Sequence, residues 1–202
     1  MQRYRLILLT LIFLLLASCG KAPLLQQESF VFGTRVELLI AGLPDEQARP
    51  AVTAVLQEFD RLHRTYHAWK PSELSALNAS IAKGETARVT PEMAALIADA
   101  QRFSDDSGGL FDPGIGRLIE RWGFQSDEFK AVLPDPESLA AWRAARPGMA
   151  DLQLDGEQLR SRSRQVALDF GGYLKGVALD RAVVILKERG VHNALINIGG
   201  NV

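Results

Sequence analysis

The sequence has very little cysteine: Cys19 is the only one in 202 residues. A single cysteine cannot form a disulfide within the chain, so a disulfide-stapled scaffold is excluded. An excess of one charge is also absent, because 23 lysine and arginine residues stand against 24 aspartate and glutamate residues. We expect no nucleic-acid partner, because a surface that binds nucleic acid needs an excess of basic residues. With 47% hydrophobic residues, the chain suits one folded core rather than extended disorder.

A long membrane-spanning run is missing as well. The apolar stretch over residues 6–16 is too short to cross a bilayer comfortably, and it follows Arg3 and Arg5. A basic start, a short apolar stretch and then small residues are typical of a secretory signal peptide, which we place at residues 1–18.

The end of this signal, Leu-Ala-Ser-Cys over residues 16–19, resembles a bacterial lipobox. The resemblance implies cleavage before Cys19 and acylation of its sulfur. The alternative is an ordinary signal peptide with a chance cysteine. We expect residues 19–28 to be a tether. The protein would then be lipid-anchored to a bacterial membrane, facing the periplasm or the outer side of the cytoplasmic membrane.

The remaining residues, 29–202, mix helix and strand patterns without strict alternation. This favours an α+β fold in which a mixed or antiparallel sheet packs with helices. An apolar strand just before Val202 would need partners on both sides, so we expect a C-terminally truncated domain.

Periodicity, capping residues and turn residues predict the individual elements. The expected strands and hairpins are a strand over 29–40 interrupted at Gly33, a hairpin over 152–162, a strand over 165–170 and a strand over 192–200. The expected helices are one that opens at Asp45 and becomes regular near Pro50, one over 72–81 capped by Ser72, one from Thr90, one within 111–124, one over 135–146 and one after Gly172.

Two adjacent glycines, Gly171 and Gly172, precede a helical pattern that carries Lys175 near its start. The start of a helix exposes backbone N–H groups and the positive end of the helix dipole, and glycine allows a phosphate to approach closely. Asp169 could accept hydrogen bonds from the same ligand. The pattern suits a diphosphate, whereas the alternative is a tight turn followed by a solvated lysine. Neither a Walker loop nor a G-x-G-x-x-G fingerprint is present.

Four ordered motifs resemble those of the ApbE-like FAD:protein FMN transferases. They are FGTRVELLI, KPSELSALN, GGLFDPGIGRLIERWGF and LDFGGYLKGVALDRAVVILKERGVHNALINIGGNV. The resemblance implies an ApbE-like fold, of which residues 29–202 are the N-terminal portion. It also implies Mg²⁺-dependent transfer of FMN from FAD to a threonine of target flavoproteins, with release of AMP. The partners would be flavoproteins on the periplasmic side of the membrane.

The resemblance also implies site residues. The positions of the family's FAD contacts fall on Leu110, Phe111, Asp112 and Asp169. Lys175 falls on the residue near the FAD phosphates, and Gly172 falls on the residue whose carbonyl meets the metal. Phe32 falls on the family's Met-Gly-Thr methionine; it can pack on a ring but lacks the adaptable thioether.

The resemblance also implies an aromatic residue that stacks on the flavin, and two residues are candidates for it. We expect Trp69, because a flat π-face on a loop is what an isoalloxazine ring needs. Tyr66 is the alternative, and a third possibility is that both rings are only packing residues. His63 and His67 are four positions apart across a helix end. They could form a metal pair, but packed or solvated histidines are the favoured interpretation.

The family's remaining metal ligands, a carboxylate and a threonine, lie beyond the final Gly-Gly of this chain by the same resemblance. We therefore expect residues 1–202 alone to be a fragment or truncated product with little or no transferase activity. No catalytic base is assigned. Two other functions stay open: a lipoprotein that binds FAD or hydrolyses it to FMN and AMP, and a tethered adaptor without a cofactor.

Overall fold

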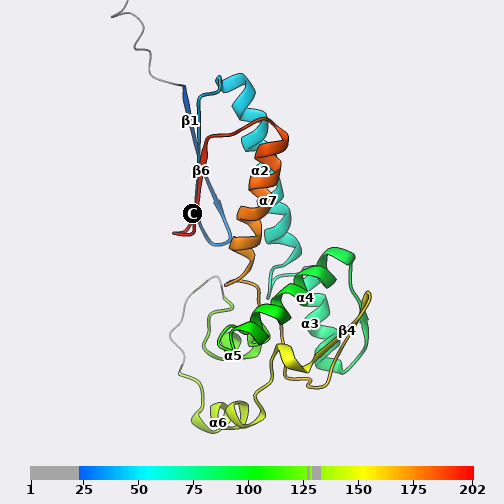
Figure 1. Cartoon of the computed structure of the whole chain (residues 1–202). Helices are drawn as coiled ribbons and strands as arrows, with labels where there is room; N and C mark the ends of the chain where they lie inside the picture. Colours follow the sequence, from blue (N-terminus) through cyan, green and yellow to red (C-terminus); the bar gives the residue numbers. More distant parts are fainter. Residues whose placement is uncertain (1–22, 127, 129–132) are drawn as a thin grey trace, which may run out of the picture.

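The computed structural model describes residues 23–126, 128 and 133–202; the predicted signal peptide and Cys19 lie outside them. The chain forms two stacked halves (Figure 1). The first half contains β1 (Leu24–Val31), β2 (Thr34–Ala41), α2 (Asp45–Thr65), α7 (Leu174–Glu188) and β6 (Ala194–Ile198). The second contains α3 (Glu73–Lys83), β3 (Ala87–Arg88), α4 (Pro91–Asp106), α5 (Gly116–Arg121), α6 (Pro136–Ala145), the 3-10 turn Met149–Asp151, β4 (Leu152–Asp155) and β5 (Gln158–Ser161).

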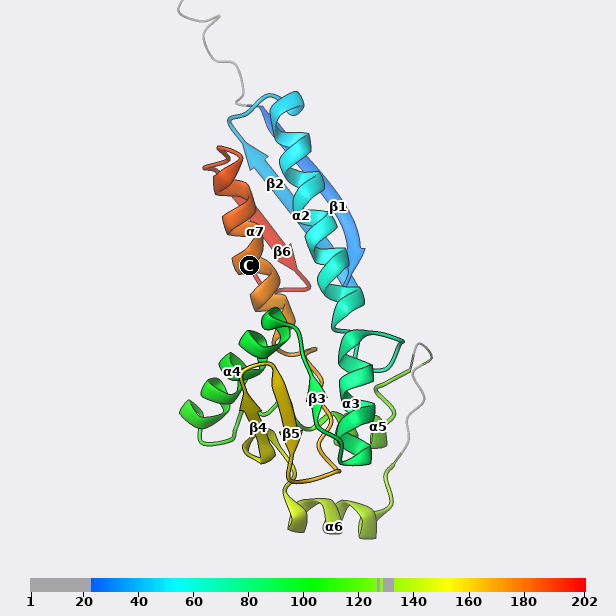
Figure 2. The ribbon, with the colours of Figure 1, turned by 90° about the vertical axis from the view of Figure 1, so that its right-hand side faces the viewer.

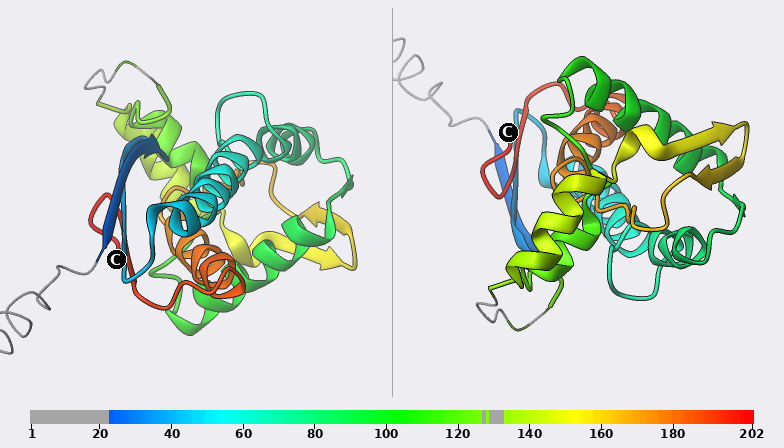
Figure 3. Two further views of the ribbon diagram at one scale, coloured as in Figure 1. Left: turned by 90° about the horizontal axis from the view of Figure 1, so that it is seen from above. Right: turned by 90° about the horizontal axis from the view of Figure 1, so that it is seen from below.

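The larger sheet has the order β1-β2-β6 with antiparallel pairing, so the expected α+β class is confirmed. Helices α2 and α7 lie side by side on one face of it (Figures 2 and 3). Alternate residues of β2, namely Val36, Leu38 and Ile40, are almost fully buried. Burying each such side chain contributes about 1.5–3 kcal/mol. Small residues on α7, Ala178 and Ala182, are also fully buried, which allows close helix packing.

The expected single strand over 29–40 is wrong, because the structure folds this stretch into a hairpin. Phe32 and Gly33 form a two-residue turn with φ values of 56° and 69°, and Val31 pairs with Thr34. Two positive φ values match the right-handed twist of paired strands. Strand β1 begins at Leu24, inside the range expected to be a tether.

The expected strand over 165–170 is also wrong. The segment forms only an isolated bridge between Ala167 and Ile115. Its apolar pattern instead reflects complete burial, since Val166, Leu168 and Phe170 are at most 1% exposed. The sequence resembles that of a strand because the segment is deeply buried, although it pairs with no neighbouring strand along its length. Asp169 and the two glycines lie at its end, directly before α7.

Local signals elsewhere predicted the elements well. Ser72 caps α3 by accepting a hydrogen bond from the Ser75 N–H at 3.0 Å, and Thr90 caps α4. The hairpin of β4 and β5 forms as expected. Helix α2 is regular from Asp45 onward, earlier than expected, with Pro50 inside it. No helix among the described residues is long and apolar enough to cross a membrane.

Candidate functional site

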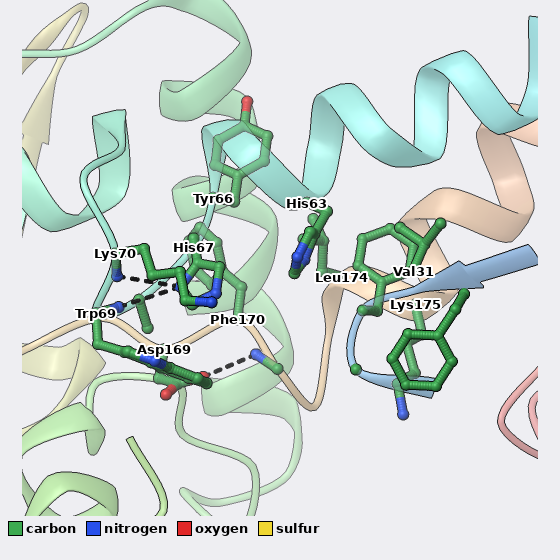
Figure 4. A pocket seen from close by; sticks show the side chains of 15 residues that line it. Val31, His63, Tyr66, His67, Trp69, Lys70, Asp169, Phe170, Leu174 and Lys175 are labelled. Carbon is green, nitrogen blue, oxygen red and sulfur yellow. Dashed lines mark hydrogen bonds between the residues drawn. The ribbon is translucent and has the colours of Figure 1, made fainter. Parts of the chain in front are cut away.

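A hollow of about 300 Å³ lies where the two halves meet. Four pieces of chain surround it: the β1–β2 turn, the end of α2, the loop before α3 and the segment entering α7 (Figure 4). The residues that line it include Phe32, Trp69, Asp169 and Lys175, which are far apart in the sequence. The structure therefore brings four of the predicted site residues to one place.

Aromatic rings form one side of the hollow. The Phe32 ring centroid lies 6.0 Å from that of Phe59, which fixes Phe32 against the core. Trp69 is 42% exposed, so a face of its indole can be reached. Tyr66 is only 3% exposed and packs against Phe170 at 6.1 Å, and burial raises the pKa of its hydroxyl. Of the two candidate stacking residues, Trp69 is the accessible one.

The N-terminus of α7 supplies positive potential to the hollow. Lys175 is the second residue of this 15-residue helix and lines the hollow. Tyr173 and Leu174 both donate their N–H groups to the Phe170 carbonyl. Within the described part of the chain, the N–H groups of Gly172 and Lys175 have no backbone acceptor. Unpaired N–H groups and the helix dipole together favour an anion here.

Asp169 is held firmly at the floor of the hollow and is only 9% exposed. One carboxylate oxygen accepts the N–H of Gly171 at 2.9 Å, and the other accepts from Gln125 Nε2 at 3.1 Å. Gln125 was not predicted as a site residue, because nothing in its local sequence indicates a partner 44 positions away.

The two glycines before α7 were expected to leave room for a ligand beside the backbone. Neither Gly171 nor Gly172 has a positive φ, so backbone conformation does not demand glycine at these positions. A Cβ added at Gly172 would meet no protein atom within 4 Å. The space beside Gly172 is therefore open, as the close approach of a ligand would require. Gly172 does not line the main hollow.

Leu110, Phe111 and Asp112 do not line the main hollow either. Leu110 is 94% exposed. The Phe111 ring packs near Phe103 at 6.3 Å and near Tyr173 at 6.1 Å, and these three rings line a second, shallower hollow. Their contact with FAD stays a prediction.

The Asp112 carboxylate joins two loops of the protein. It accepts the N–H of Gly114 at 2.7 Å and the N–H of Met149 at 3.0 Å. Burial raises the pKa of Asp112, whereas these two hydrogen bonds oppose that rise. A Cβ at Gly148 would lie 2.2 Å from its carboxylate, so this position requires glycine. The side chain of Asp112 therefore holds these two loops together.

His63 and His67 both line the hollow, and their ring centroids are 5.1 Å apart. His67 Nδ1 accepts the backbone N–H groups of Trp69 and Lys70 and is therefore not available to a metal. No group of three His, Cys, Asp or Glu side chains among the described residues could hold a metal ion. The four-residue spacing of His63 and His67 in the sequence had indicated that the two side chains lie close together.

Comparisons with known proteins identify the family and the fold. Residues 32–202 match the model of the ApbE family. The chain is 39% identical over 181 residues to the FAD:protein FMN transferase of Rhodobacter capsulatus, covering 90% of this chain and 35% of that protein. It is 27% identical over 194 residues to the FAD:protein FMN transferase of Vibrio cholerae, covering 94% of this chain and 57% of that protein.

Solved structures show the same fold. The ApbE protein of Thermotoga maritima superposes with a TM-score of 0.78 at 26% identity, over 88% of this chain and 57% of that chain. The flavin transferase ApbE of Vibrio cholerae superposes with a TM-score of 0.77 at 24% identity, over 89% of this chain and 58% of that chain. The chain thus spans little more than half the length of these structures. Because the family model covers residues 32–202, the chain belongs to the ApbE family.

Proposed function

We propose that the protein transfers FMN from FAD to a threonine of target flavoproteins and releases AMP. The observation that carries this proposal is the main hollow, which Trp69, Phe32, Lys175 and the start of α7 line together. Flat apolar rings suit the isoalloxazine, and the cationic helix start suits the diphosphate. Relatives named FAD:protein FMN transferase support the same reaction.

The reaction needs stabilisation of charge on the diphosphate. The threonine oxygen forms a bond to the phosphorus of the FMN half, the bond from that phosphorus to the bridging oxygen breaks, and AMP leaves with that oxygen. The threonine proton passes to a base. Lys175 and the N–H groups at Gly172 and Lys175 would hold the phosphate oxygens in a fixed positive field.

We propose Mg²⁺ as the metal, which would neutralise charge on the phosphates when bound. Of the described residues, the carbonyl of Gly172 is the one proposed ligand. Mg²⁺ needs about six oxygen ligands in octahedral geometry. The described residues hold no carboxylate cluster that could supply them. The described residues alone therefore do not form a magnesium site.

The predicted location belongs to the same proposal. A lipid on Cys19 would hold the enzyme at the membrane, facing the periplasm or the outer side of the cytoplasmic membrane. The lipobox-like Leu-Ala-Ser-Cys sequence supports this location. The partners would then be membrane-associated or periplasmic flavoproteins that carry an acceptor threonine. Metabolic labelling with a fatty-acid analogue, compared with Cys19→Ser, measures the modification directly.

Two experiments test the function. Deletion of the gene in its bacterial host should remove covalently flavinylated bands from in-gel fluorescence, and the intact gene should restore them. Separately, the purified chain should retain flavin absorbance after dialysis against FAD-free buffer. Unchanged fluorescent bands in the deletion strain would contradict transfer, and the absence of retained flavin would contradict the proposed FAD site.

The purified 202-residue chain also tests whether these residues alone support transfer with Mg²⁺. With FAD, Mg²⁺ and a target protein, we expect FAD binding but little covalent transfer, because only one ligand is proposed among these residues. FMN in place of FAD is the matched control, since it has no AMP to release. A strong covalent flavin band that requires FAD would show that these residues suffice, and the metal argument would be wrong.

A further inference from the structure

The side chain of His67 holds the backbone of the loop that carries Trp69. Its Nδ1 accepts the backbone N–H of Trp69 at 3.4 Å and that of Lys70 at 3.2 Å (Figure 4). Its backbone carbonyl accepts from Ser72 Oγ at 2.6 Å, and Ser72 in turn caps α3. His67 thus joins the end of α2 to the start of α3 through both its side chain and its backbone.

This geometry fixes the protonation of the ring. A nitrogen that accepts N–H donors carries no proton, and a neutral imidazole has one such nitrogen. Nδ1 of His67 is therefore the acceptor, and the proton lies on Nε2. The imidazole also meets the Trp69 indole edge to face, with centroids 4.4 Å apart and planes at 79°. The ring thus contacts Trp69 twice, at its backbone and at its side chain.

We propose that His67 is a positioning residue that holds the Trp69 indole at the edge of the hollow, ready to stack on the flavin. The inference rests on the proposed function. Trp69 lies on a surface loop and is 42% exposed, so its own packing does not fix it. Two N–H groups directed at one acceptor restrict the backbone that bears the indole. An indole that is already ordered loses less conformational entropy when a ligand binds to it.

Two variants separate the acceptor from the ring. His67→Asn keeps an acceptor, because an asparagine side chain bonds readily to the backbone N–H two residues ahead. His67→Phe keeps the aromatic contact with Trp69 but has no acceptor. If Nδ1 matters, the asparagine variant resembles the wild type and the phenylalanine variant does not. If ring packing matters, the order is reversed.

The readout is Trp69 itself. In a Trp122→Phe, Trp142→Phe background only Trp69 fluoresces, because the chain has three tryptophans. Acrylamide quenching without ligand measures the order of the loop, and quenching by FAD gives the affinity. We expect His67→Phe to raise acrylamide quenching and weaken FAD binding by roughly three- to ten-fold, while His67→Asn stays within about two-fold of the background protein. Thermal unfolding of each variant separates a loop effect from a loss of folding.

A pH profile adds a signature that simple packing does not produce. Protonation of Nδ1 removes the acceptor, so acid should reduce the order of Trp69 in the background protein but not in His67→Asn. The other titratable or charged groups lining the hollow are His63 on α2, Lys70 on the loop, Asp169 before α7 and Lys175 on α7. These groups act equally in His67→Asn, so the difference between the two profiles isolates His67.

The outcomes are distinct. Equal acrylamide quenching in His67→Phe and the background protein overturns the inference, and so does a His67→Asn variant that behaves like His67→Phe. Failure of every form to bind FAD contradicts the proposed function instead. In that case the ligand-free quenching still decides whether His67 orders the loop.

Discussion

The Asn78 side chain on α3 replaces a missing strand partner for the segment that leads into the site. Its Oδ1 accepts the Leu168 N–H at 2.7 Å, and its Nδ2 donates to the Leu168 carbonyl at 2.8 Å. Leu168 is fully buried and comes directly before Asp169. We expect Asn78→Ala to destabilise the protein strongly, because it removes the hydrogen-bond partners of both the N–H and the carbonyl of the buried Leu168.

The magnitude follows from the two groups left unpaired. A buried donor or acceptor without a partner costs about 1–3 kcal/mol. The better helix propensity of alanine returns about 0.5 kcal/mol. For the two groups together, the expected net loss is about 1.5–5.5 kcal/mol. A domain of ordinary stability, about 5–15 kcal/mol, would lose a large part of its free energy of unfolding.

Equilibrium unfolding in urea, followed by far-ultraviolet circular dichroism, measures this loss. The midpoint should fall while the slope stays constant. Lys83→Ala is the matched control, because Lys83 is an exposed residue of the same helix and its loss should change stability by less than about 0.5 kcal/mol. A loss below about 1 kcal/mol in Asn78→Ala would refute the view that this side chain satisfies a sealed backbone segment.

Three further outcomes are expected. Lys175→Ala should weaken FAD binding about ten-fold at low salt, with unchanged unfolding temperature, by fluorescence titration; unchanged affinity contradicts its phosphate role. Gly172→Ala should not lower the unfolding temperature, since its Cβ meets no protein atom within 4 Å, but should weaken FAD binding in the same titration. Hydrogen bonding from Arg61 lowers the pKa of Glu92 below 4.5. The ionised Glu92 therefore adds to the free energy of unfolding above its unfolded pKa, and this contribution is lost as pH falls through the lower folded pKa. Glu92→Gln should therefore make the free energy of unfolding fall less steeply at acid pH.

Local sequence signals predicted the parts of the fold that depend on neighbouring residues. Ser72 and Thr90 act as helix caps because their side chains reach N–H groups three positions ahead. The turn at Phe32–Gly33 was missed, since phenylalanine is not a usual turn residue, yet Phe32 takes a φ of 56°. In that conformation the Phe32 ring lines the hollow, where a glycine or asparagine would supply no aromatic ring.

Contacts between distant residues could not be predicted from the sequence. The 165–170 segment was expected to be a strand, because nothing near it indicates that Asn78, 90 positions from Leu168, supplies its hydrogen bonds. Gln125 holds Asp169 in the same manner. In both cases an amide side chain satisfies a buried polar group, and an isolated Asn or Gln carries no pattern that marks such a role.

The arrangement of the candidate site suggests a reason for Gly172 that the fold itself does not supply, whereas a Cβ at Gly171 would lie 3.0 Å from the Asp169 carboxylate. The segment Gly171 to Tyr173 passes between the main hollow, which Gly171 lines, and the shallower one, which Tyr173 lines. Neither a positive φ nor a packing clash requires glycine at 172. A dinucleotide has two flat ring systems joined by a charged bridge, and that bridge needs close access to N–H groups between two apolar surfaces. Gly172 leaves such access open, as the proposed FAD site would require.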